Sequence, residues 1–336
     1  MLFLVHLDVH KPHLSLPLQN PFFIPVKDGC EARAKALSRQ SVRGGVSVKC
    51  MFVGPVAVDE QEQKRIALDL IKNGSVDGIS ISVIDEAVAT EVIDEAVAAD
   101  IPIITFDSDA PQSKREAYVG TDNLAFGEEL ALLLLTRFSK SGKFALVSDN
   151  NPNLFLRETG IRNILNENDW VEVSGSPLHV GQSYGSGPVD MMFDLMNKQP
   201  DIDAMMLTMG IPMWSGEEGQ WESFVQSYPD LIIISADSMP VQIDLLNRGF
   251  VNGLVGQQPY DMGAKSIDTL LAISKGNEVK EIIPTRLVLI GRVGEANPYN
   301  QLDMFSSASR RMNPSSSILL CIFALLGLIV VGIVMF

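Results

Sequence analysis

Short apolar strands that alternate with amphipathic helices are the feature that most constrains this fold. Two β-branched runs, VSVKCMFVG (46–54) and VDGISISVI (76–84), have the length of strands. Between them, residues 59–74 place Ile66 and Leu70 on one helical face. This alternation predicts βαβ units, and therefore an α/β fold with parallel sheets and right-handed crossovers. Further strand candidates lie at residues 13–19, 101–107, 143–150, 202–210, 231–237 and 251–259.

Composition and charge exclude several classes of protein. With 336 residues the chain has room for two domains, and its 46% hydrophobic content indicates a globular core. The formal net charge of −15 argues against a nucleic-acid partner, because a phosphate backbone requires a basic face.

The three cysteines are too few for a disulfide scaffold. Cys321 lies in an apolar tail, which leaves Cys30 and Cys50 as the plausible pair. They are either two small buried thiols or a single bridge in an oxidising compartment. We expect them to lie close together.

The two ends of the chain differ in character. Residues 317–336 carry no charge and are long enough to cross a bilayer, which predicts a C-terminal transmembrane helix after a polar tether at 298–316. Residues 1–12 are predicted to be a short N-terminal lead. This lead has no basic region and no small-residue cleavage site, so it is not typical of a signal peptide.

Common catalytic motifs are absent from the sequence. It contains no Walker phosphate loop, no G-x-G-x-x-G after a strand and no G-x-S-x-G elbow. The glycine-rich GQSYGSG at 181–187 lacks the lysine that a phosphate loop needs. Three histidines, His6, His10 and His13, surround a proline and do not have the spacing of a metal site. We therefore expect no enzyme activity, no cofactor and no metal.

Polar side chains follow several of the predicted strands. Any one of them alone is most simply a solvated turn or a helix N-cap. A parallel sheet, however, brings the carboxyl ends of its strands to one edge, so together they would surround a single crevice. Carboxylates and amides suit hydroxyl groups, and aromatic rings suit the C–H faces of a sugar. The candidates are Asn20, Phe22, Phe23, Asp107, Asp149, Asn150, Asp237 and Gln257, with Arg157 as a charged partner.

Five segments together resemble the type I periplasmic sugar-binding proteins, and above all the ribose- and galactose-binding receptors of ABC transporters. The resemblance runs from about residue 13 to about residue 295. The segments are LQNPFFIPVKDGCEARAKAL (18–37), VDGISIS (76–82), AVAADIPIITFDSDAP (96–111), YVGTDNLAFGEELALLLL (118–135) and GQQPYDMGAKSIDTLL (256–271).

The resemblance implies two doubly wound parallel-sheet lobes, joined by a hinge of three crossing segments, with the ligand clamped between them. The N-terminal lobe would comprise residues 13–121, completed by about 258–286. The C-terminal lobe would comprise residues 122–257, completed by about 287–297.

The resemblance also assigns roles to individual residues. Asn20 matches an amide that bonds sugar hydroxyls, and Phe22 and Phe23 match aromatic residues that stack on the sugar. Asp107 and Arg157 match a carboxylate and an arginine that bond hydroxyls. Two further hydroxyl-binding positions are matched by Asp237 and Gln257.

Three positions depart from the ribose-binding pattern. Ser108 stands where an arginine follows the strand-end aspartate, Ser82 stands where an asparagine is often found, and Met209 lies near another usual asparagine. Ser82 and Ser108 are kept as ligand-binding candidates. These changes remove polar partners and leave the identity of the sugar open.

The function implied by the resemblance is capture of a small sugar or related polyol and its delivery to an ABC permease. The alternative is a membrane-tethered sensor that passes the signal to a membrane receptor. In either case the lobes would lie in the cell envelope on the periplasmic face, anchored by residues 317–336. Arg310 and Arg311 before the anchor favour the opposite, cytoplasmic tail-anchored orientation.

Overall fold

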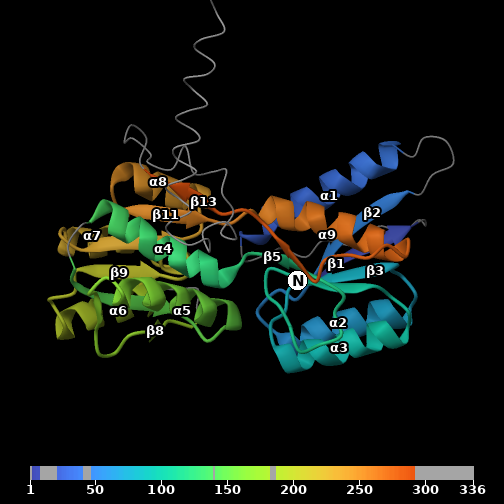
Figure 1. Ribbon diagram of the computed structural model, residues 1–336, viewed down its shortest axis with the longest axis horizontal. Helices are drawn as coiled ribbons and strands as arrows, with labels where there is room; N and C mark the ends of the chain where they lie inside the picture. The colour runs from blue at the N-terminus through green and yellow to red at the C-terminus, as the bar shows by residue number, and fades with distance from the viewer. Residues whose placement is uncertain (1, 8–20, 41–46, 139–140, 182–186, 292–336) are drawn as a thin grey trace, which may run out of the picture. The chain divides into compact units, whose positions relative to one another are not determined.

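A computed structural model of the chain describes residues 2–7, 21–40, 47–138, 141–181 and 187–291. These residues form two β-sheets, each flanked by helices (Figure 1). This α/β architecture agrees with the alternation of strands and helices in the sequence.

The first sheet has the strand order β12-β5-β4-β3-β1-β2. Its strands are β1 (Leu2–Leu7), β2 (Val48–Val53), β3 (Gly78–Ile81), β4 (Ile103–Phe106), β5 (Tyr118–Gly120) and β12 (Ile282–Pro284). Helices α1 (Phe23–Gln40) and α9 (Pro259–Ser274) cover one face, and α2 (Glu60–Lys72) and α3 (Glu86–Ala98) cover the other (Figure 1).

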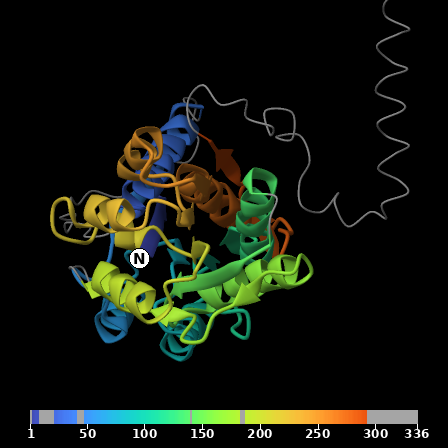
Figure 2. The same cartoon turned by 90° about the vertical axis from the view of Figure 1, so that its left-hand side faces the viewer.

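The second sheet has the strand order β13-β11-β10-β9-β6-β7, and β8 also pairs with β6. The strands are β6 (Lys143–Ser148), β7 (Val171–Glu172), β8 (Leu178–His179), β9 (Ala204–Leu207), β10 (Ile232–Ala236), β11 (Gly253–Gly256) and β13 (Val288–Ile290). Around this sheet lie α4 (Asn123–Arg137), α5 (Pro152–Asn166), α6 (Gly187–Lys198), the 3₁₀ turn η1 (Ile211–Met213), α7 (Gln220–Ser227) and α8 (Pro240–Arg248) (Figure 2).

Two strands run against the parallel direction that the sequence predicts. β1 pairs antiparallel with both β2 and β3, so the predicted N-terminal lead contributes a strand of the first sheet. The strand expected at residues 13–19 lies outside the described residues. β13 is the other exception, and it pairs antiparallel with β11 at the edge of the second sheet, where mixed sheets commonly accept such a strand.

Each face of the first sheet has its own apolar core. Ile104 and Phe106 of β4 pack toward α1 and α9, whereas Ile103 of the same strand packs toward α2 and α3. Successive side chains of a strand point to opposite faces, so a strand covered on both sides must be apolar throughout. This requirement explains the uninterrupted IITF sequence of β4.

Three segments connect the two sheets. Residues 121–122 lead from β5 to α4, which packs on β10 and β11, and residues 257–258 lead from β11 back to α9. Residues 285–287 join β12 to β13. We call the three segments the crossings, and the two sheets with their helices the first and second lobes.

Among the described residues, no helix combines the length and apolar character needed to span a membrane. The segment predicted to do so, residues 317–336, lies outside them.

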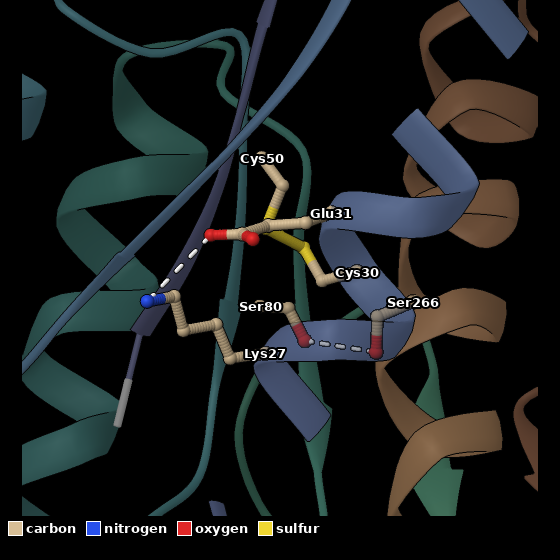
Figure 3. The surroundings of a disulfide bond; sticks show 6 residues. All are labelled: Lys27, Cys30, Glu31, Cys50, Ser80 and Ser266. Atoms are coloured by element: carbon tan, nitrogen blue, oxygen red, sulfur yellow. Dashed lines mark hydrogen bonds and ion pairs between the residues drawn. A yellow bond between two sulfur atoms is a disulfide. The ribbon is translucent and has the colours of Figure 1, made fainter. Parts of the chain in front are cut away.

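A disulfide joins Cys30 of α1 to Cys50 of β2, with their Cα atoms 5.8 Å apart (Figure 3). Cys30 is fully buried in the core cluster between the sheet and α1. Of the two alternatives left by the sequence, the structure has the bridge. The bond fastens the first helix to a strand 20 residues further along the chain.

Reduction of this disulfide should lower the free energy of unfolding by about 3 kcal/mol, because the closed loop restricts the unfolded chain. Urea unfolding of the oxidised and the reduced protein measures the difference. A Cys30→Ala/Cys50→Ala double variant is the control and should not respond to reductant. Equal stability of oxidised and reduced wild-type protein would contradict the prediction.

Candidate functional site

A cleft of about 140 Å³ lies at the carboxyl ends of β4, β6, β9, β10 and β11, with walls from both lobes. Open α/β sheets bind ligands at this position. Eight candidate residues from the sequence line the cleft, namely Phe22, Phe23, Asp107, Ser108, Asp149, Arg157, Asp237 and Gln257. Ser82 is buried directly beside it, and Asn20 lies outside the described residues.

Asp107 follows β4 in a left-handed backbone conformation with φ of 59°. Its backbone N–H donates to the carbonyl of Val119 in β5 (3.1 Å). Its own carbonyl accepts from the Tyr118 hydroxyl (2.9 Å) and from Nδ2 of Asn153 (2.7 Å), which belongs to the second lobe. The carboxylate accepts a hydrogen bond from Ser82 (3.2 Å). Both the backbone and the side chain of Asp107 are thus held from several sides.

Asp237 occupies the equivalent place in the second lobe. It follows β10 with φ of 72°, and its N–H donates to the carbonyl of Val255 in β11 (2.8 Å). Its carboxylate accepts from the N–H of Gly210 (3.2 Å) and from Nε2 of Gln257 (2.8 Å). A positive φ is uncommon and costly for a residue with a side chain, and such strain is concentrated at functional sites. Each lobe therefore turns one strand-end carboxylate toward the cleft with the same backbone geometry.

Arg157 on α5 is the cation of the cleft and is only 4% exposed. Its Nε donates to Oδ1 of Asn123 (2.8 Å) and its Nη1 donates to the carbonyl of Thr208 (2.8 Å). The guanidinium lies over the ring of Phe126, 4.4 Å from the ring centroid. Burial lowers the pKa of Arg157, and the carboxylates of Asp237 and Asp107 oppose that shift. Among the described residues, the remaining guanidinium nitrogen, Nη2, has no hydrogen-bond partner.

The pKa of Asp107 is raised to about 6, mainly because burial disfavours the charged carboxylate. Arg157 and the hydroxyl of Ser82 oppose the rise, whereas the carboxylate of Asp237 adds to it. The ionised form of the Asp107 carboxyl is therefore costly in the empty site, and a hydroxyl group that donates a hydrogen bond to it would stabilise that form.

Apolar residues line the rest of the cleft. The rings of Phe22 and Phe23 meet edge to face with centroids 5.4 Å apart, and Phe23 packs against Phe106 of the core in the same manner. On the other side lie Leu154, Met209, Ile211, Trp214 and Met239. A flat ligand with hydroxyls at its rim and C–H groups on its faces matches this arrangement.

Sequence reasoning missed several lining residues. Asn153 lies four residues before Arg157, one helical turn away on α5, and this spacing was a usable signal. Trp214 and Met239 gave none, because loops after β9 and β10 bring them to the cleft. Asp149 was identified as a strand end, and it lines the cleft.

Comparison with known proteins agrees with this geometry. Residues 15–278 match the periplasmic binding protein domain family, so the chain belongs to that family. The ribose import binding protein RbsB of Bacillus subtilis is 26% identical over 277 residues, covering 81% of this chain and 84% of RbsB. The D-allose-binding periplasmic protein of Escherichia coli is 23% identical, with 78% and 83% covered.

A solved structure gives the same result. GanP, a glucose-galactose binding protein from Geobacillus stearothermophilus, superposes with a TM-score of 0.70 at 25% identity, covering 82% of this chain and 94% of GanP. The resemblance to sugar-binding periplasmic proteins that the sequence indicated is thereby confirmed.

Replacement of Asp107 by asparagine should raise stability at neutral pH. A carboxyl whose folded pKa lies near 6, above its unfolded value of 3.8, stabilises the fold at low pH and loses that contribution as the pH rises through 6. Asparagine does not ionise, so the stability of Asp107→Asn should not fall in this way as the pH rises, and asparagine also tolerates the left-handed backbone. Its advantage over wild type should grow by up to about 3 kcal/mol between pH 4 and pH 7. Urea unfolding at both pH values measures it, and a pH-independent difference would contradict it.

Proposed function

We propose that this chain captures one small sugar or related polyol between its two lobes and delivers it to an ABC importer. The observation that carries the proposal is the cleft itself, in which Asp107, Arg157 and Asp237 lie together with aromatic and aliphatic side chains. Relatives named for ribose import and D-allose binding support the same reading.

The chemistry of the cleft favours a neutral polyol. Carboxylates accept hydrogen bonds from hydroxyl groups, and a guanidinium donates hydrogen bonds to hydroxyl oxygens. One sugar ring with several hydroxyl groups therefore satisfies the carboxylates and the guanidinium at the same time. Phe22 and Phe23 of the first lobe supply a stacking surface, and the second lobe contributes further apolar contacts through Leu154, Met209 and Trp214. Asn20, outside the described residues, is proposed as a further hydroxyl partner.

Specificity within the sugars depends on the positions where polar groups are few. Ser108 is buried beside Asp107, and Met209 forms part of the second-lobe wall. Ser82 uses its hydroxyl on Asp107. We propose that the sugar presents apolar ring atoms, and not hydroxyl groups, toward Met209.

Closure of the lobes about the crossings completes the proposed mechanism. Asp107 and the phenylalanines belong to the first lobe, whereas Arg157 and Asp237 belong to the second. A ligand that bonds to both sets gains all its contacts only when the lobes are closed, and it therefore shifts the population toward the closed state.

Asp107→Asn and Asp237→Asn should each weaken sugar binding by about 1.5–3 kcal/mol at pH 7.5, because each loses a charge-assisted acceptor. Titration calorimetry with D-ribose, D-allose, D-arabinose and D-galactose measures the change. Asp201→Asn is the matched control, since Asp201 is exposed and pairs with Lys143 far from the cleft. Wild-type affinity in both cleft variants would place the site elsewhere.

We infer that residues 317–336 anchor the chain in a membrane with the lobes on its outer face. The uncharged length of this segment supports the anchor. The disulfide between Cys30 and Cys50 supports the outer face, because such bonds persist in oxidising compartments. Arg310 and Arg311 count in the other direction, but two charges orient a span only weakly.

Protease added to intact spheroplasts that express the full chain should digest the lobes. A chain that ends at residue 316 should leave the membrane fraction, which tests the anchor separately. Full protection of the lobes until lysis would reverse the orientation, and a membrane-bound shortened chain would refute the anchor.

A further inference from the structure

The three crossings are bonded to one another at Thr121. Its hydroxyl donates to Oε1 of Gln257 in the second crossing (2.8 Å). In the third crossing, the N–H of Thr285 donates to the carbonyl of Gly120, directly before Thr121 (2.7 Å). Rotation of one lobe against the other about the crossings would change the geometry of these bonds.

Tyr118 and Gln257 link the first crossing to both strand-end aspartates. The Tyr118 hydroxyl lies within hydrogen-bond distance of the carbonyls of Thr121 (3.1 Å) and Asp107 (2.9 Å). Gln257, which receives the Thr121 hydroxyl, donates through Nε2 to the carboxylate of Asp237 (2.8 Å). The crossings are therefore linked to the Asp237 carboxylate through Gln257 and, by way of Tyr118, to the backbone carbonyl of Asp107.

Asn123 makes the corresponding link to Arg157. It is the first residue of α4, is 5% exposed, and lies two residues after Thr121. Its Nδ2 donates to the carbonyl of Thr121 (3.3 Å), and its Oδ1 accepts from Nε of Arg157 (2.8 Å). The side chain of Asn123 does not cap the helix, because Asp122 is the N-cap residue and its side chain accepts from the N–H of Ala125.

One face of α4 contacts Arg157 at three successive positions. Asn123 bonds its Nε, the Phe126 ring lies under its guanidinium, and Gly127 allows α5 to approach. A Cβ atom at Gly127 would lie only 2.0 Å from the Arg157 carbonyl oxygen. The spacing i, i+3, i+4 places all three on the same side of the helix. With the Thr208 carbonyl on Nη1, these contacts involve Nε, Nη1 and the face of the guanidinium, and Nη2 has no hydrogen-bond partner in the part of the chain that the structure describes.

We propose that Asn123 is a positioning residue that aims Arg157 into the cleft and ties it to the hinge at Thr121. A ligand that bonds to Nη2 then restricts the motion of Arg157, of Asn123 and of the first crossing. Occupancy of the cleft therefore determines the angle between the lobes. This inference rests on the proposed function, because it concerns the regulation of the same site.

The position requires the chemistry of an amide. Arg157 offers only donors and the Thr121 carbonyl only accepts, so the linking side chain must accept from one and donate to the other. Aspartate keeps the acceptor and loses the donor, and alanine loses both. The two substitutions therefore separate the contact with Arg157 from the contact with the hinge.

The first test needs no ligand. In ¹H–¹⁵N spectra of the full-length chain in detergent, the Nε–H of Arg157 should exchange slowly with water in wild type and in Asn123→Asp. It should exchange rapidly in Asn123→Ala. Unchanged protection in Asn123→Ala would overturn the proposal whether or not any sugar binds.

The second test is calorimetry with the same sugars as above, together with the fluorescence of the cleft residue Trp214. Asn123→Ala should bind about tenfold to a hundredfold more weakly, since a hydrogen bond to a charged group is lost. Asn123→Asp should recover part of that affinity but show a smaller ligand-induced fluorescence change, because its link to Thr121 is broken.

Asn252→Ala is the matched control. Asn252 accepts from the N–H of Ile233 (2.7 Å) at the start of β11, at the edge of the sheet opposite the cleft. It should lose stability in urea and keep wild-type affinity. An equal affinity loss in Asn252→Ala and Asn123→Ala would show a merely structural role and overturn the proposal. A wild-type chain that binds none of the sugars would instead count against the proposed function.

Discussion

A guanidinium taken out of water needs partners on every side, and the burial of Arg157 is the constraint on which the rest of the site depends. A buried charge without hydrogen bonds is costly, so its neighbours are all specified. Asn123 and the Thr208 carbonyl take two of its nitrogens, and Phe126 lies against its face. Arg157 lines the cleft, where the carboxylates of Asp237 and Asp107 favour its charged form and oppose the lowering of its pKa by burial. Helix packing, strand ends and hinge are therefore arranged around a single side chain.

The two strand-end aspartates, Asp107 and Asp237, have conformations that lower the stability of the fold. Both adopt a left-handed backbone, and Asp107 in addition carries a carboxyl whose pKa is near 6 because of burial. Asparagine would remove the electrostatic part of this cost without changing the backbone. A single substitution to asparagine would therefore stabilise the fold at neutral pH. The presence of aspartate at such a position is better explained by a contact with a ligand than by a role in the core.

Much of this arrangement could be predicted because it follows from local pattern and sheet geometry. Apolar strands that end in Asp107 and Asp237 bring each carboxylate to the carboxyl edge of its own sheet, and both edges border the cleft. The direction of β1 could not be predicted, since the run Leu2–Leu7 fits either direction. Nor could the sequence decide whether Cys30 and Cys50 are bridged, because a buried thiol and a half-cystine have the same apolar surroundings. Trp214 reaches the cleft through tertiary packing, and no pattern in the sequence predicts its position there.

The central claim is that ligand contact at the cleft sets the angle between the lobes. The most direct measurement is the distance between spin labels on exposed residues of each lobe, Glu95 of α3 and Lys198 of α6, by electron double resonance in the full-length chain with Cys321→Ser. Without sugar, a broad distribution of distances is expected. A saturating sugar that calorimetry shows to bind should shift it to a single narrow population, and Asn123→Ala should reduce that shift. A distribution that stays the same with the sugar bound would contradict the account.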